Sequence, residues 1–198
     1  MEIEAKVILA SGKLPSPQTI IECLDAMQKS VNENIFDSYY ENKHGKLRVR
    51  WNKTTSDENC VTITKKIRRI VDNVECNDEY EFSMSKEAFD NFFSKLMFEA
   101  KYKLYDKKEK RFSRFTAVVH SDGAHIPICI DVGYAGSQTL PTMLPYIEIE
   151  TISEDSPEMR ENCVKAIKLA FSSLGIHSSE LDSRRWREIF KDKEKECK

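Results

Sequence analysis

The sequence predicts an α+β protein dominated by an antiparallel β-sheet or β-barrel. About eight segments alternate apolar and polar residues with the period of a β-strand, and only three longer segments have helical spacing. The polar positions of these segments carry mostly ionised side chains. The chain has 198 residues, of which 40% are apolar, and this is enough for one domain with a buried core. We expect a single domain over residues 1–198, with a helical tail at 176–198.

Three segments place apolar residues on one face of an amphipathic helix, namely 16–29, 85–98 and 157–174. The first begins with Ser16 and Pro17, a capping residue followed by proline at the first helical position. We assign all three apolar stripes to the core and expect no chemistry from them.

A fourth, shorter helix is expected at 183–190, where Trp186 and Phe190 would dock it onto the domain. The residues that follow, 191–198, are mostly charged, so we expect them to fray.

Period-two alternation predicts strands at 1–9, 36–41, 46–52, 60–70, 78–84, 101–119, 126–132 and 145–151. Ionised side chains occupy every second position in most of these strands, and their signs are segregated by strand. The charged positions are Glu2, Glu4, Lys6, Arg48, Arg50, Lys66, Arg68, Glu79, Glu81, Asp131, Glu148 and Glu150. Opposite charges on neighbouring strands of one face attract each other, so this segregation favours an ordered charged face.

Two structures are consistent with such a charged face. It is the solvated side of an ordinary sheet, or it is the inner wall of a closed barrel whose apolar outer face the helices cover. A charged lumen cannot be dry and empty, because unpaired buried charges cost several kcal/mol each. The barrel would therefore need a polyanion beside its basic strands and a metal ion beside its clustered carboxylates.

The residue types define the chemistry that a charged lumen would support. Paired glutamates on two strands supply hard oxygen ligands suited to Mg²⁺ or Mn²⁺. Arginines and lysines opposite them hold phosphate oxygens, and a divalent metal assists phosphoryl transfer. The chain has no glycine-rich phosphate loop, no pattern of nucleophilic catalysis, and no histidine spacing typical of zinc sites.

The strand motifs resemble those of the triphosphate tunnel metalloenzymes, also called the CYTH superfamily. The likeness covers roughly residues 1–175, and several motifs occur in the family's order. They are Glu2-Ile-Glu-Ala-Lys6, Asp37-Ser-Tyr-Tyr40, Leu47-Arg-Val-Arg50, Thr64-Lys-Lys66, Glu79-Tyr-Glu81, Ile130-Asp-Val132 and Tyr146-Ile-Glu-Ile-Glu150. The resemblance implies a closed eight-stranded antiparallel tunnel that binds a triphosphate lengthwise and hydrolyses it with a divalent metal.

The resemblance also implies a role for each charged position. Glu2, Glu4, Glu148 and Glu150 would hold Mg²⁺ or Mn²⁺ and are expected to be essential for catalysis, as is Arg111. The phosphates would be bound by Lys6, Arg48, Arg50, Lys66, Arg68, Lys107 and Arg111. Glu79, Glu81 and Asp131 would orient these basic groups or a metal-bound water. The nucleophile would be water, because the sequence shows no activated serine, cysteine or lysine.

Within the family, the sequence is most similar to the RNA 5′-triphosphatases of fungal, protist and viral mRNA capping. Ile67-Arg-Arg69 and Arg111-Phe-Ser113 resemble two of their motifs. Two positions depart from the pattern, because Glu109 stands where the basic strand has a lysine and Asn77 stands where an arginine is common. We expect an RNA 5′ end as substrate and a capping enzyme as partner. Tripolyphosphatase, thiamine triphosphatase, adenylyl cyclase and a non-catalytic polyphosphate- or RNA-binding module remain alternatives.

RNA beyond its first nucleotide would have to lie on the outer surface of such a tunnel. Six basic residues do not fit the inward alternation and are expected to bind it there, namely Lys43, Lys46, Lys101, Lys103, Lys108 and Arg114.

The composition limits the class of protein further. A net charge of −2 from 31 basic and 33 acidic residues excludes a uniformly basic nucleic-acid coat. No apolar run approaches the ~18 residues of a membrane span. The acidic N-terminus is unlike a signal peptide, and six scattered cysteines favour reduced thiols. We therefore expect an intracellular protein of the nucleus or cytoplasm that does not bind membranes.

Overall fold

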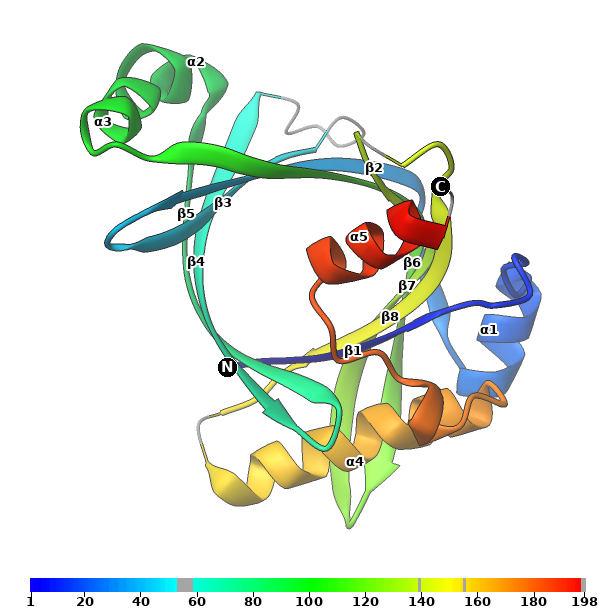
Figure 1. Cartoon of the computed structure of the whole chain (residues 1–198). Coiled ribbons are helices and arrows are strands. Elements are labelled where there is room, and N and C mark those ends of the chain that lie inside the picture. The colour runs from blue at the N-terminus through cyan, green and yellow to red at the C-terminus, as the bar shows by residue number, and fades with distance from the viewer. Residues whose placement is uncertain (53–58, 139, 155, 197–198) are drawn as a thin grey trace.

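A closed barrel of antiparallel strands forms the centre of the structure, a computed structural model that describes residues 1–52, 59–138, 140–154 and 156–196 (Figure 1). Within these residues the eight strands follow one another in the order β1-β5-β4-β3-β2-β6-β7-β8, and β8 pairs with β1 to close the ring. The predicted α+β barrel is confirmed. Closure pairs every strand on both sides, so the described sheet has no free edge.

The strands are long, and some begin earlier than the alternation predicted. They are β1 (Glu2–Ile8), β2 (Met27–Asn42), β3 (Gly45–Asn52), β4 (Cys60–Val71), β5 (Val74–Ser85), β6 (Lys103–Ser121), β7 (Ala124–Ser137) and β8 (Leu144–Ile152). β5 begins at Val74 because it forms a tight hairpin with β4, in which Val74 pairs with Val71. The extension brings residues 74–77 into the barrel, where the sequence predicted no strand.

The helices lie between and after the strands. They are α1 (Pro17–Leu24), α2 (Lys86–Ala88), the π-helical turn η1 (Phe89–Phe93), α3 (Ser94–Glu99), α4 (Pro157–Ser173), the 3₁₀ turn η2 (Ser178–Glu180) and α5 (Trp186–Glu196). The helix predicted at 85–98 is the run α2-η1-α3, and the one predicted at 157–174 is α4. In the part of the chain that is described, no helix has both the length and the apolar character needed to cross a membrane.

Helices cover the apolar outer face of the barrel, as the alternation predicted. Ile167 and Phe171 of α4 share one buried cluster with Ile3, Ile130 and Ile149, which point outward from β1, β7 and β8. The run α2-η1-α3 covers β3 and β4 with a second cluster of its own. Since the odd-numbered residues of β1 are used in this way, its even-numbered residues face the lumen.

The first helix is shorter than predicted. The prediction of helix for residues 25–29 is wrong. Helix α1 ends at Leu24 because Asp25 takes a left-handed conformation (φ 48°). The chain then turns into β2, where Met27 pairs with Thr116 of β6. Met27 is therefore an exposed strand residue instead of a core residue of a helix.

The C-terminal helix α5 packs into the barrel instead of onto its outer face. Trp186 and Phe190 join one apolar cluster with Phe112 of β6 and Tyr146 of β8, whose side chains point inward. The rings of Trp186 and Tyr146 meet edge to face, with centroids 5.1 Å apart. Figure 1 shows α5 lying over the barrel interior beside β6, β7 and β8.

The prediction that residues 191–198 fray is wrong as far as Glu196. Helix α5 continues to that residue, and Lys193 pairs with Glu196 at 2.6 Å. Asp192 accepts from Arg184 at 2.9 Å, which ties the helix to the segment before it. Residues 197–198 of the predicted tail lie outside the described residues.

Gly133 of β7 allows two strands to approach each other closely. A Cβ at this position would lie 2.0 Å from the backbone oxygen of Arg111 and 2.6 Å from Cα of Phe112. A Cβ on Gly136, further along the same strand, would lie 3.1 Å from the flexible side chain of Met143 and at an ordinary 3.7 Å from its Cα.

We predict that Gly133→Ala lowers the free energy of unfolding by roughly 1–3 kcal/mol, because the backbone of β6 would have to move. Urea denaturation measures this difference. Gly136→Ala is the matched control and should cost clearly less. Equal effects of the two substitutions would contradict the close approach at Gly133.

Candidate active site

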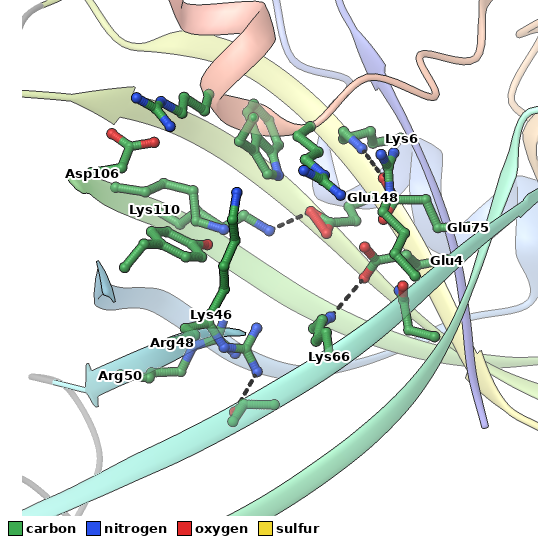
Figure 2. Close-up of a pocket in the computed structure, with 18 of the residues that line it drawn as sticks. Glu4, Lys6, Lys46, Arg48, Arg50, Lys66, Glu75, Asp106, Lys110 and Glu148 are labelled. Atoms are coloured by element: carbon green, nitrogen blue, oxygen red, sulfur yellow. Dashed lines mark hydrogen bonds and ion pairs between the residues drawn. The ribbon is translucent and has the colours of Figure 1, made fainter. Parts of the chain in front are cut away.

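The barrel encloses a charged cavity of about 350 Å³ (Figure 2). Side chains from all eight described strands and from α5 line it. Its size lies within the usual range of small-molecule sites, roughly 300–1,000 Å³. The solvated-face interpretation of the alternating charges is therefore wrong, and the interpretation with a charged lumen is confirmed.

Three carboxylates meet on one wall of the cavity. Glu2 and Glu4 come from β1, and Glu150 comes from β8, where it pairs directly with Glu4 across the strands. One oxygen from each lies within 4.8 Å of the others. Carboxylate oxygens at this spacing match the ligand preference of Mg²⁺ and Mn²⁺.

The proximity of these three carboxylates changes their pKa values. Burial and the charge of Glu4 raise the pKa of Glu2 to about 9. Burial and the charge of Asp131 raise the pKa of Glu150 to about 7. Burial also disfavours the charged form of Glu4, but the surrounding lysines, Lys66 first, outweigh burial and lower its pKa. Burial and repulsion between neighbouring carboxylates thus disfavour the charged forms of Glu2 and Glu150, whereas the lysines favour the charged form of Glu4.

Glu148, the fourth predicted metal ligand, lies beside this group and is paired with a lysine side chain. Its carboxylate accepts a hydrogen bond from Nζ of Lys110. Burial works against the charged form of Glu148, but Lys110 outweighs it and lowers the pKa. The structure therefore brings three of the four predicted glutamates together and pairs the fourth with a lysine.

The predicted phosphate-binding residues of β3 and β4 face the carboxylates from the opposite wall (Figure 2). Nη2 of Arg48 donates to the hydroxyl of Thr64 at 3.0 Å and lies 3.5 Å from Glu81. Nζ of Lys66 donates to Glu2 at 2.6 Å and also pairs with Glu79.

Arg50 belongs to an ion cluster around Asp37, whose carboxylate is fully buried. Its Nε and Nη2 donate to the two carboxylate oxygens of Asp37 at 2.7 and 3.0 Å. Lys108 pairs with the same carboxylate at 3.1 Å. Burial raises the pKa of Asp37, but the two cations outweigh burial and hold it well below the usual value of 3.8.

Asp131 sits opposite a basic residue that the sequence placed elsewhere. It accepts from Nε and Nη2 of Arg114 at 2.7 and 2.8 Å. Arg114 also reaches Glu150 at 3.1 Å, so it links Asp131 to the carboxylate group.

The prediction of which β6 residues face the lumen is wrong by one position. Lys107 and Arg111 are exposed and do not line the cavity, and Arg111 pairs with Glu109 on the outer surface at 2.7 Å. Between Lys108 and Arg114 the even-numbered charged residues of β6 face the lumen, so Lys108, Lys110 and Arg114 lie inside, although Lys108 and Arg114 were expected outside. The run of charges in this strand has no clean alternation, and a slip of one residue reverses every side chain.

Lys6 and Arg68 share a buried carboxylate that the sequence did not single out. Oε1 of Glu75 accepts from Nζ of Lys6 at 2.9 Å and from Nη2 of Arg68 at 2.6 Å. Arg68 also donates to the backbone oxygen of Ser183, which anchors the segment before α5. The alternation Glu75, Asn77, Glu79 could have revealed this residue, had the strand been extended back from residue 78.

By sequence, the chain matches no known family profile and no curated protein. By structure, it is similar to several solved proteins of low sequence identity. A protein from Pyrococcus horikoshii OT3 has a TM-score of 0.69 and 20% identity, with 98% of this chain and 99% of that chain covered. A candidate adenylate cyclase from Vibrio parahaemolyticus has a TM-score of 0.63 and 13% identity, covering 96% and 97%.

A third solved structure, a candidate adenylyl cyclase from Hippeastrum, is described as having a dominant triphosphatase activity. It has a TM-score of 0.52 and 14% identity, with 98% of this chain and 96% of that chain covered. At these identities the likeness shows the fold.

We predict that Asp37→Asn lowers the free energy of unfolding at pH 7 by about 3–5 kcal/mol, because Arg50 and Lys108 would lose their carboxylate. The folded-state pKa of Asp37 is depressed, so its contribution is complete above pH 4 and is lost as the pH falls toward that pKa. The difference between wild type and variant should therefore shrink in acid. Urea titrations at several pH values measure it.

The matched control is Asp122→Asn, which removes an exposed pair with Lys165 and should cost less than ~1 kcal/mol. A loss at Asp37 no larger than this control, or one independent of pH, would contradict the buried cluster.

Proposed function

We propose that this protein is a divalent-metal-dependent hydrolase that removes the γ-phosphate of a triphosphate bound inside the barrel. The proposed substrate is the 5′-triphosphate end of RNA. One observation carries the proposal, namely three clustered carboxylates on one wall of a closed cavity, opposite a wall of arginines and lysines.

The residues present fit a divalent metal. Glu2, Glu4 and Glu150 offer hard oxygen ligands, and the raised pKa values of Glu2 and Glu150 indicate a site that favours added positive charge. These three glutamates would hold Mg²⁺ or Mn²⁺. A bound divalent metal supplies Lewis-acid stabilisation of the charge on the phosphoryl oxygens.

The basic wall supplies the phosphate contacts. Arg48 and Arg50 of β3, Lys66 of β4 and Lys110 of β6 project into the same cavity, so they can hold a chain of phosphates in an extended arrangement. Nε of Arg48 is buried and has no hydrogen-bond partner among the described residues. A phosphate oxygen would satisfy this donor, which supports an anionic occupant.

The nucleophile is a water molecule. No serine or cysteine is present among the described residues that line the cavity, and the hydroxyl of Thr64 donates to Glu81 at 2.8 Å. A water oxygen forms the new bond to the γ-phosphorus, and the bond to the oxygen between the β- and γ-phosphorus breaks. The products are orthophosphate and a diphosphate end.

A second candidate function is adenylyl cyclisation, since two of the structural neighbours are named as candidate adenylyl cyclases. The two functions differ in the bond that breaks. A cyclase expels pyrophosphate from ATP, whereas the proposed hydrolase releases orthophosphate.

We predict that the protein releases labelled orthophosphate from γ-labelled RNA in the presence of Mg²⁺ or Mn²⁺. Chromatography of the products from RNA, tripolyphosphate and ATP, each with both metals, tests this. Cyclic nucleotide and pyrophosphate from ATP would establish the cyclase instead. Hydrolysis of tripolyphosphate without hydrolysis of RNA would support the proposed triphosphate hydrolysis but contradict RNA as the substrate.

We predict that Glu150→Gln lowers turnover more than tenfold, about 1.4 kcal/mol of barrier, because it removes one of the three clustered carboxylates. It should also reduce the rise in melting temperature that Mn²⁺ causes in the wild type. The control is Glu109→Gln, which changes a carboxylate outside the cavity. Unchanged turnover and unchanged Mn²⁺ stabilisation in Glu150→Gln would exclude this group as the metal site.

We predict that saturating tripolyphosphate with Mn²⁺ stabilises the folded protein, because a ligand that binds the native state shifts unfolding by mass action. A concentration of 100 times Kd would add about 2.7 kcal/mol. Calorimetry with and without both ligands measures the shift. No shift would mean that the cavity does not bind a triphosphate.

A further inference from the structure

The basic side chains that line the cavity fall into two classes according to their partners. Each one that a strand contributes already has a carboxylate oxygen within 4.0 Å. The pairs are Lys6–Glu75, Lys46–Glu41, Arg48–Glu81, Arg50–Asp37, Lys66–Glu2, Arg68–Glu75, Lys108–Asp37, Lys110–Glu148 and Arg114–Asp131.

The second class comes from the C-terminal segment. Arg185, Arg187 and Lys191 line the cavity, and no carboxylate of the described residues lies within 4.0 Å of their charged nitrogens. Arg185 and Lys191 are exposed while still lining the cavity, so they stand at its rim. Glu188, their neighbour in α5, uses its carboxylate to accept from the backbone N–H of Arg185 at 2.8 Å.

Arg187 is held in place by an aromatic ring. Its guanidinium lies 4.8 Å from the ring centroid of Tyr105 in β6. Asp106 on that strand accepts from the backbone N–H of Lys107 at 2.9 Å. Burial raises the pKa of Asp106, and this hydrogen bond and the nearby cations, Arg187 first, offset the rise only in part. Asp106 also lines the cavity, and Figure 2 shows it at the end away from Glu4 and Glu75.

Unpaired cations bind an anion at a lower cost than paired ones. A paired arginine must share or give up a carboxylate when a phosphate arrives, whereas an unpaired one exchanges only water and counterions. The rim cations are therefore suited to an anion that lies outside the cavity. A chain of many nucleotides is larger than a cavity of about 350 Å³, so most of an RNA would have to lie outside it.

We propose that Arg185, Arg187 and Lys191 form a second phosphate-binding site, which takes the phosphodiester groups that follow the first nucleotide of RNA. This inference rests on the proposed function, because the triphosphate end must enter the cavity for the chain to reach the rim. The C-terminal helix then selects a polynucleotide over a small triphosphate, while the strands bind the reacting phosphates.

Trp186 reports directly on this arrangement. Its ring centroid lies 5.9, 5.8 and 5.3 Å from the ammonium nitrogens of Lys6, Lys108 and Lys110. The other tryptophan, Trp51, packs against Phe89 in a separate cluster. In a Trp51→Phe background, the fluorescence of Trp186 therefore shows whether α5 is docked and whether an anion occupies the cavity.

The test compares the triple variant Arg185→Gln, Arg187→Gln, Lys191→Gln with the double variant Lys193→Gln, Lys195→Gln. The control residues lie on the same helix, pair with Glu196 and Asp192, and do not line the cavity. Probes are a 5′-triphosphorylated RNA of ten nucleotides and tripolyphosphate. Binding is followed by anisotropy and by Trp186 fluorescence without added metal, and turnover is followed with Mn²⁺.

The triple variant should bind the RNA at least tenfold more weakly and raise its KM by the same factor, with kcat unchanged. Its affinity for tripolyphosphate should stay within twofold of wild type. The slope of log affinity for RNA against log salt should become shallower by about 0.7 for each RNA phosphate that the variant no longer neutralises. The control variant should match wild type with both probes.

Three outcomes would overturn the proposal. They are unchanged RNA affinity in the triple variant, an equal loss for tripolyphosphate, and an equal loss for a long inorganic polyphosphate, which would make the site a general polyanion site. Unshifted Trp186 emission in the free variant verifies that α5 is still docked. If it shifts, the single variant Arg185→Gln at the exposed rim replaces the triple variant and should give a smaller loss in the same direction.

A failure of the rim-site proposal can be distinguished from a failure of the proposed hydrolase function. Absent hydrolysis by the wild type with every substrate would reject the hydrolase, whereas the binding comparison needs no turnover. Normal hydrolysis of RNA by the triple variant, with unchanged KM, would reject the rim site alone.

Discussion

Charge neutralisation inside a closed barrel is the constraint on which the rest of this structure depends. Alternate residues of a strand must point inward, and here most of them are ionised. Isolated charges would cost several kcal/mol each, so the fold is stable only if acids and bases meet across strands. The antiparallel order achieves this, because β3, β4 and β6 carry most of the bases while β1, β5 and β8 carry most of the acids.

The ratio of cations to carboxylates differs between two places in the cavity, and the two places can therefore do different chemistry. At Asp37 two cations surround one fully buried carboxylate. At Glu2, Glu4 and Glu150 three carboxylates share Lys66 and Arg114, and the pKa values of two of them rise. The first arrangement stabilises the wall, whereas the second leaves a place that a divalent cation would stabilise.

The C-terminal helix connects the apolar and the ionic parts of the interior. One side of α5 buries Phe190 and Trp186 against Phe112 and Tyr146, which fixes the helix within the ring of strands. The same helix, with the residue before it, brings basic side chains to the cavity without bringing matching acids within ion-pair distance among the described residues. Burial of the apolar side of α5 thus positions basic side chains that, unlike the cavity-lining ones of the strands, have no carboxylate within 4.0 Å among the described residues.

The sequence by itself determined which charged residues share one face of the sheet, because period-two alternation fixes the face once a strand is recognised. The alternation left open whether that face is solvated or lines a barrel, and the resemblance of the strand motifs to a known family favoured the barrel. Together they placed Glu2, Glu4, Arg48, Arg50, Lys66 and Glu150 at the cavity. It did not determine the register of β6, where a run of charges hides the alternation, so Lys107 and Arg111 were placed inside in error. Only the tertiary structure decided the partners of each charge, the early start of β5 that buries Glu75, and the path of α5 into the barrel. These features depend on contacts between residues far apart in the chain, and no local pattern encodes such contacts.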